Sequence, residues 1–111
     1  MLARTYRLRK NSDFQRLYKS GKRFATPSLV LYYAPSKLDY SQFAMVVSKK
    51  VSKKAVTRNT LRRRVSALVE ESFNSITTPT KAIILIRRDF SATTPADLKK
   101  EVQTLLAKVV V

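Results

Sequence analysis

A long basic and amphipathic segment between two short apolar runs most constrains how this chain can fold. Between positions 49 and 64 the chain carries eight lysines and arginines and no acid. Apolar residues then recur at helical spacing, which predicts a helix from residue 52 to about 74. Runs 43–47 and 82–86 are short and continuously apolar, as is typical of central strands that are covered on both faces. A helix that joins two buried strands predicts a parallel crossover and an α/β fold.

Shorter elements are predicted before this unit. Residues 1–10 carry four cations and are expected to form an extended basic arm. A short helix is expected to follow, with Ser12 as its N-cap and Gly21, the only glycine, as a left-handed C-cap. Residues 24–34 alternate as a strand, and one or two strands are expected in this part of the chain.

The end of the chain predicts one more helix. Thr94 is placed to cap it, Pro95 suits its first position, and Asp97 lies in its first turn. Apolar residues follow at helical spacing from Leu98 to Val109. Because no linker or repeat divides the sequence, we expect a single domain over residues 1–111, built as a compact α/β sandwich.

The chain has a large positive charge. Lysine and arginine number 23 against 7 acids, which gives a formal net charge of +16. The excess positive charges repel one another and destabilise the compact state unless a partner neutralises them. Nucleic acid and an anionic membrane surface are the two candidate partners. No apolar run approaches the roughly 20 residues of a membrane span, so nucleic acid is the leading interpretation and no membrane is expected.

Two residue types that are missing from the sequence restrict its chemistry. Without cysteine there is no disulfide framework and no thiolate metal site, which suits a reducing compartment, and we expect a cytoplasmic protein. Without histidine the commonest general base and metal ligand are lost. The acids form no spaced pair with a polar partner, and no glycine-rich phosphate loop is present. We predict neither a catalytic residue nor a metal site in the protein.

Within the predicted basic helix, four residues form a fan beside the apolar stripe: Arg58, Asn59, Arg62 and Arg63. Guanidinium groups suit phosphate because their fork donates two parallel hydrogen bonds and stays charged. The alternative is a solvated helix face without a ligand. Exposed helices usually interleave Glu with Lys for support, and this stretch does not, so we favour a binding face.

A second group combines aromatic and apolar residues: Phe14 and Tyr18 on one helix face, and Val30 and Tyr32 on one strand face. Aromatic rings beside cations can stack the bases of a single strand, at about 1–3 kcal/mol per base. The same residues could instead pack the helix on the sheet. From the pattern alone, core packing is the favoured interpretation.

Residues 46–63 read Val-Val-Ser-Lys-Lys-Val-Ser-Lys-Lys-Ala-Val-Thr-Arg-Asn-Thr-Leu-Arg-Arg and resemble the signature of the bacterial ribonuclease P protein subunit. In that family an apolar strand ends in Ser-Lys-Lys, and a short basic loop leads to a helix that starts with Arg-Asn-Arg. The residues around 8–14, Gly21, the strand at 30–32 and the late strand at 83–87 also resemble the family's pattern, in the same order.

The resemblance implies the small protein subunit of an RNA enzyme that removes the 5′ leader from precursor tRNA. It implies two partners, the catalytic RNA and precursor tRNA, with one protein per catalytic RNA. It also implies Mg²⁺, held mainly by the catalytic RNA. The fold it implies is a four-stranded mixed sheet packed with helices, whose βαβ crossover is left-handed, against the rule for about 98% of such units.

The resemblance also assigns site residues. The predicted RNA-binding residues are Lys49, Lys50, Lys53, Lys54, Arg58, Asn59, Arg62 and Arg63. The predicted leader-binding cleft consists of Phe14, Tyr18, Val30, Tyr32 and Arg87, which reverses the preference for core packing.

The sequence departs from the family's pattern at several positions. Thr60 replaces the second arginine of Arg-Asn-Arg, and Ser66 stands where relatives often carry a basic residue. Glu70 and Glu71 make the far half of the helix less basic. Two alternatives stay open at this point: a structural RNA-binding protein such as one that docks on the ribosome, and a membrane-surface peptide.

Overall fold

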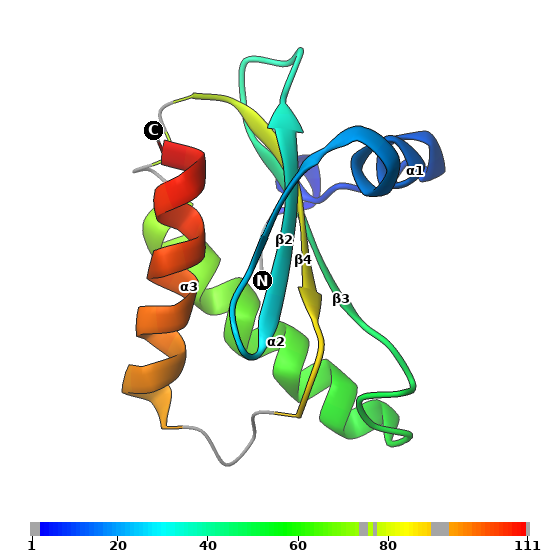
Figure 1. The fold of residues 1–111 in the computed structure, drawn as a ribbon, viewed down its shortest axis with the longest axis vertical. Helices are drawn as coiled ribbons and strands as arrows, with labels where there is room; N and C mark the ends of the chain where they lie inside the picture. Colours follow the sequence, from blue (N-terminus) through cyan, green and yellow to red (C-terminus); the bar gives the residue numbers. More distant parts are fainter. Residues whose placement is uncertain (1–2, 74–75, 77, 90–93, 111) are drawn as a thin grey trace.

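One four-stranded sheet with helices on both faces makes up the fold (Figure 1). The computed structural model describes residues 3–73, 76, 78–89 and 94–110. A short 3₁₀ turn, η1, comes first at Arg4–Tyr6. The remaining elements are α1 (Asn11–Ser20), β1 (Lys22–Ala25), β2 (Leu29–Pro35), β3 (Gln42–Val47), α2 (Ala55–Ser72), β4 (Thr80–Ile86) and α3 (Pro95–Val110).

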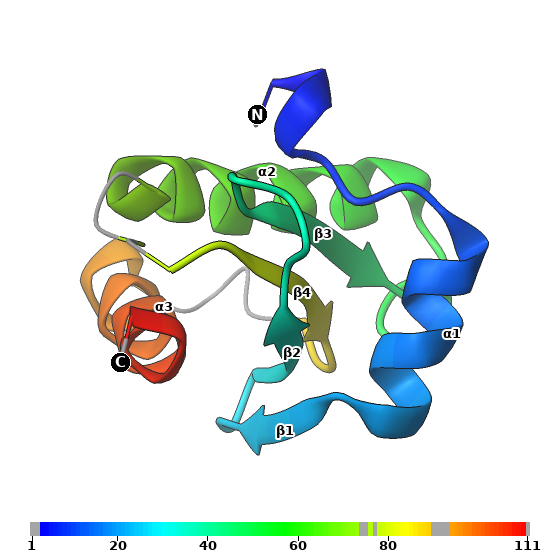
Figure 2. The same cartoon turned by 90° about the horizontal axis from the view of Figure 1, so that it is seen from above.

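The sheet is mixed, with its strands in the order β1-β2-β4-β3. β2 runs antiparallel to both β1 and β4, whereas β3 and β4 are parallel. The chain leaves β3, returns through α2 and enters β4 beside it, which makes a left-handed crossover that can be followed in Figures 1 and 2. The predicted four-stranded mixed sheet and its unusual connection are confirmed.

The two faces of the sheet are covered by different helices. α2 and α3 lie on one face and α1 lies on the other (Figure 2). Because side chains alternate along a strand, Ile84 of β4 joins the larger core under α2 and α3, and its neighbour Ile83 joins a smaller core with Leu8 and Leu17 beneath α1. The α1 face therefore carries the residues of the predicted cleft, and the α2 face carries most of the core.

The alternating run 24–34 forms two strands, the second of the two alternatives that the sequence left open. A turn at positions 26–28 separates β1 from β2, and the two strands pair as a hairpin in which Ala25 lies opposite Val30. Thr26 N donates to Leu29 O at 2.8 Å. Pro27 has no N–H to donate to a neighbouring strand. The alternation of the residue pattern therefore continues across a position at which the hydrogen-bond ladder is interrupted.

β3 lies at the edge of the sheet, so the prediction of a central strand was wrong for residues 43–47. Phe43 and Val47 are buried, and the three residues between them are half-buried. The start of this edge is covered by the N-terminal arm, where Leu8 N donates to Phe43 O at 2.9 Å and Arg7 bridges to Phe43. Residues 43–47 have the apolar pattern of a central strand because α2 and the arm bury them, as a further strand would.

The ends of α1 differ from the prediction. The helix begins at Asn11, and its N-cap is Lys10 rather than Ser12, with no side-chain capping bond. Gly21 follows the helix with a φ of −71°, so it is not a left-handed cap. A Cβ at Gly21 would lie 2.6 Å from Leu17 O, and this close approach of the backbone is what requires glycine here.

The other two helices agree with the sequence. α2 spans Ala55–Ser72, shorter at its start than the predicted range, and buries Leu61, Val65 and Val69. In α3, Asp97 N donates to Thr94 Oγ1 at 3.2 Å, and Pro95 is the first helical residue, as predicted. In the part of the chain that the structure describes, every helix is too short or too polar to cross a membrane.

Candidate nucleic-acid interface

The loop before α2 exposes four of the predicted RNA-binding lysines. Val51 N donates to Ser48 O at 3.1 Å, which closes a turn with Lys49 and Lys50 at its two central positions. Both side chains are exposed, as are those of Lys53 and Lys54. The turn therefore presents a cluster of flexible ammonium groups at the end of β3.

Arg58 fastens this loop to α2. Its Nη1 donates to Ser52 O at 2.9 Å, and Lys54 N donates to Ser52 Oγ at 3.3 Å. The guanidinium has five N–H donors, so this bond leaves others for a ligand. Arg58 thus holds the loop at the start of the helix in addition to the binding role that the sequence predicts.

The rest of the predicted fan lies on one exposed face of α2. Arg62 is half-buried and donates from Nη2 to Asn59 Oδ1, one helical turn earlier. Arg63 is exposed. The structure thus brings Asn59 and Arg62 into contact and leaves Arg63 pointing to solvent. We call Arg58, Asn59, Arg62 and Arg63 the basic helix face.

The departures at Thr60 and Ser66 have different structural outcomes. Thr60 Oγ1 donates back to Val56 O at 3.0 Å, so the residue that replaces an arginine is turned onto its own helix. Ser66 is buried, with 1% of its surface exposed. This position lies beneath the basic helix face rather than on it.

On the opposite face of the sheet, two tyrosines form the open part of the predicted cleft. The rings of Tyr18 on α1 and Tyr32 on β2 are 5.0 Å apart and meet edge to face at 75°. Tyr18 is 43% exposed, and its partial burial, followed by the neighbouring Tyr32, raises its pKa. At neutral pH the ring is uncharged and available for stacking.

The remaining cleft residues lie deeper or farther away. Phe14 is half-buried against Leu8, Leu17 and Ile83. Val30 is only 3% exposed and presents little surface to a ligand. Arg87 is exposed beyond the end of β4, and its Nε donates to Pro27 O at 3.2 Å. We keep the name leader cleft for Phe14, Tyr18, Val30, Tyr32 and Arg87.

A hollow of about 250 Å³ connects the two surfaces across the edge of β3. Phe14 of the leader cleft and Arg62 of the basic helix face both line it. Its other lining residues are Arg7, Leu8, Arg9, Phe43, Ala44, Met45, Val46 and Ser66. We call it the bridging hollow, because a ligand seated there touches both surfaces.

Sequence reasoning missed the part that the arm plays in this hollow. Arg7 and Arg9 flank the buried Leu8, so the two arginines are exposed on either side of an inward-facing residue. That alternation, together with the apolar run 43–47, was the available signal for an arm that pairs with a strand edge. Without the strand order, nothing in the sequence showed which strand offers that edge.

In the described part of the chain, no three acidic, histidine or cysteine side chains lie close enough together to hold a metal ion. The expectation that the catalytic RNA holds the Mg²⁺ stays a prediction.

The chain is similar to proteins of one family. Residues 2–110 match the family described as Ribonuclease P. The "Ribonuclease P protein component" of Clostridioides difficile (strain 630) is 39% identical over 106 residues, which cover 95% of this chain and 92% of that protein. The protein of the same description from Microcystis aeruginosa (strain NIES-843 / IAM M-2473) is 35% identical over 111 residues, 96% of this chain and 92% of that one.

Solved structures show the same fold. The RNase P protein from Staphylococcus aureus superposes with a TM-score of 0.84 at 30% identity, covering 96% of this chain and 98% of that one. The RNase P protein from Thermotoga maritima superposes with a TM-score of 0.82 at 25% identity, covering 93% and 96%.

Proposed function

Because this chain belongs to the ribonuclease P protein family, we propose a division of labour between its two surfaces. The protein is a subunit of the ribonucleoprotein endoribonuclease that matures the 5′ ends of tRNA, and its partners are the ribonuclease P RNA and the tRNA precursor. The basic helix face and the lysines of the preceding loop bind the catalytic RNA. The leader cleft holds the 5′ leader of the precursor.

The observation that carries this proposal is the bridging hollow. Phe14 and Arg62 line the same space of about 250 Å³, although they lie on α1 and α2, on opposite faces of the sheet. A protein built in this way can hold a structured RNA along α2 and a single strand along α1 at the same time. The leader is thereby fixed next to the RNA that cuts it.

The chemistry of the two surfaces fits these different ligands. Arginines and lysines neutralise phosphates without reading sequence, which suits a large folded RNA. Tyr18 and Tyr32 offer ring surface on which bases of any sequence can stack, which suits leaders that differ among precursors. We further propose one protein per catalytic RNA, Mg²⁺ held mainly by that RNA, and a cytoplasmic location, where bacterial precursor tRNA is made.

A cleavage assay tests the proposal. Precursor tRNA is incubated with the catalytic RNA alone, with the protein alone, and with both, at a Mg²⁺ concentration too low for the RNA alone to be efficient. We expect leader removal to be stimulated only in the mixture. Cleavage by the protein alone, or no stimulation by a protein shown to be folded, would contradict the proposal.

Substrate affinity gives a second readout. The assembled complex should bind precursor tRNA more tightly than mature tRNA, and the protein should increase that difference. A structural RNA-binding protein would show the same dependence on salt but would be indifferent to the leader. Equal affinities for the two tRNAs, in the presence and absence of the protein, would support that alternative.

A further inference from the structure

A second hollow, of about 400 Å³, lies beside the N-terminal arm and has no part in the function proposed above. The arm, the start of α1, the turn between β2 and β3, and β4 all contribute to it. Its lining residues are Arg7, Arg9, Lys10, Asp13, Lys37, Leu38, Tyr40, Gln42 and Lys81. Five of these nine residues are cations and one is an acid, so we call it the cationic hollow.

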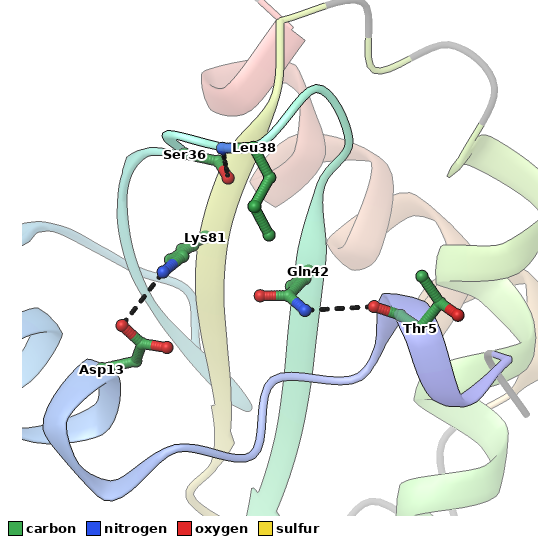
Figure 3. A network of polar contacts seen from close by, with 6 residues as sticks. All are labelled: Thr5, Asp13, Ser36, Leu38, Gln42 and Lys81. Atoms are coloured by element: carbon green, nitrogen blue, oxygen red, sulfur yellow. Dashed lines mark hydrogen bonds and ion pairs between the residues drawn. The ribbon is translucent and has the colours of Figure 1, made fainter.

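The walls of the cationic hollow are held in place by polar contacts (Figure 3). Gln42 Nε2 donates to Thr5 O at 3.1 Å, which ties β3 to the arm, and Leu38 N donates to Ser36 Oγ at 3.1 Å within the turn. Leu8 N adds its bond to Phe43 O. The cations are therefore carried by backbone segments that are fixed relative to one another.

Among the described residues, the one acid that lines the hollow is already neutralised. Asp13 is 7% exposed, and its Oδ1 lies 3.0 Å from Lys81 Nζ (Figure 3). Asp39, in the same turn as Lys37, lines a different hollow with Tyr6 and Phe73. Four exposed cations, Arg7, Arg9, Lys10 and Lys37, are left around a space whose one carboxylate is taken. Like charges gathered in this way favour an anionic ligand.

The cationic hollow continues the surface that runs from α2. Arg7 and Arg9 line both it and the bridging hollow, where they stand beside Arg62. By contrast, neither Tyr18 nor Tyr32 lines the cationic hollow. An RNA that lies on the basic helix face therefore meets Arg7 and Arg9 of the arm at the edge of β3, and these two arginines also line the hollow that contains Lys37.

We propose that the cationic hollow binds phosphates of the catalytic RNA, next to the stretch that lies on α2. The inference rests on the proposed function, because it takes the RNA on α2 to be the catalytic one. Guanidinium and ammonium groups from the arm and the turn would contact the phosphodiester backbone and extend the interface by about two phosphates.

A matched pair of double variants tests this inference. Arg9→Gln/Lys37→Gln removes two cations from the hollow, and Lys99→Gln/Lys100→Gln removes two exposed cations from α3 as a control of equal charge. Affinity for the catalytic RNA is measured over a range of salt concentrations. We expect the first variant to bind roughly tenfold more weakly or worse, with its salt slope reduced by about two, and the control to stay close to the wild type.

Other outcomes overturn the inference and separate it from the proposed function. Equal behaviour of the two double variants would mean that the hollow makes no contact with the catalytic RNA. Normal assembly with a loss of affinity only for leader-bearing tRNA would assign the hollow to the leader instead. Each of these two results overturns the inference about the cationic hollow. The proposed function still stands in both cases, provided that Arg62→Ala weakens binding and the wild type stimulates cleavage. If the wild type gives no stimulation, the proposed function itself fails.

Discussion

Tyr18 is the side chain whose contribution to the leader cleft is easiest to isolate. It is 43% exposed and touches the ring of Tyr32, so its removal costs the fold little packing. We expect Tyr18→Ala to weaken the binding of leader-bearing tRNA to the assembled complex by about 1–3 kcal/mol, the worth of one stacked base. Titration of precursor and mature tRNA against the complex measures the effect.

The matched control at this position is Tyr18→Phe. It keeps the ring and removes the hydroxyl, so it should retain the affinity for precursor if stacking is the interaction. Affinity for mature tRNA should be unchanged in both variants. An equal loss for precursor and mature tRNA would mean that Tyr18 supports the structure of the complex rather than the leader.

Arg62 is the residue through which the basic helix face meets the bridging hollow. We expect Arg62→Ala to weaken binding of the catalytic RNA by about 1–3 kcal/mol, because a charge-assisted contact is lost. Lys100→Ala on α3 loses the same charge at an exposed position and should have a much smaller effect. Filter binding at one fixed salt concentration compares the two, and unchanged affinity of Arg62→Ala would exclude the contact.

At the scale of elements, one carboxylate joins α3 to the hairpin of β1 and β2. Glu101 Oε1 accepts hydrogen bonds from Thr26 Oγ1 at 2.5 Å and from Ser28 N at 2.6 Å. The same turn meets the end of β4, where Arg88 Nε donates to Ser28 Oγ at 2.9 Å and Arg87 N donates to Ser28 O at 3.0 Å. The turn that splits the predicted strand is therefore held from two sides.

We expect Glu101→Ala to lower the free energy of unfolding by about 1–3 kcal/mol, because two donors lose their charged acceptor. Glu71→Ala is the control, since Glu71 is exposed and lies 3.9 Å from Lys99, a surface pair of little value. Urea denaturation followed by circular dichroism gives both values. Equal midpoints for the two variants would show that the hydrogen bonds to Glu101 contribute nothing to stability.

Elements whose apolar residues recur at regular spacing were predictable from the sequence. Which elements lie beside one another in space was not. α2 and α3 followed from apolar spacing, and the Thr94 cap followed from local chemistry. The turn at Pro27 was missed because alternation persists through it, and β3 was placed in the centre because an arm covers its edge. Both errors concern which segments lie side by side, a property that no local pattern contains.

The candidate site was predictable to a similar degree. Helical periodicity predicted that Arg58 and Arg62 lie beside the buried stripe of α2 and that Arg63 lies farther from it, and the structure has the first two half-buried and Arg63 exposed. Val30 is buried although it shares a strand face with Tyr32, because burial depends on what covers that end of the sheet. The bridging and cationic hollows were not predictable, since each is built from segments far apart in the chain.

At the scale of the whole molecule, the charge of +16 sets the conditions under which the protein is stable. Repulsion among the cations opposes the compact state, and any anion that binds the folded form more tightly than the unfolded form stabilises it. We expect millimolar inorganic triphosphate to raise the midpoint of thermal unfolding more than sodium chloride at the same ionic strength does. Equal midpoints in the two solutions would show that screening alone accounts for the effect.

The pairing of Arg7 and Leu8 with Phe43 has a consequence for the behaviour of free protein in solution. An uncovered outer strand offers its N–H and C=O groups to any other chain and can start the growth of intermolecular sheets. The arm occupies the first part of that strand and surrounds it with arginines, which repel a second copy that carries the same charge. Before the protein meets its RNA, we expect this edge to be shielded from a second copy by the same segment that we propose as a contact for that RNA.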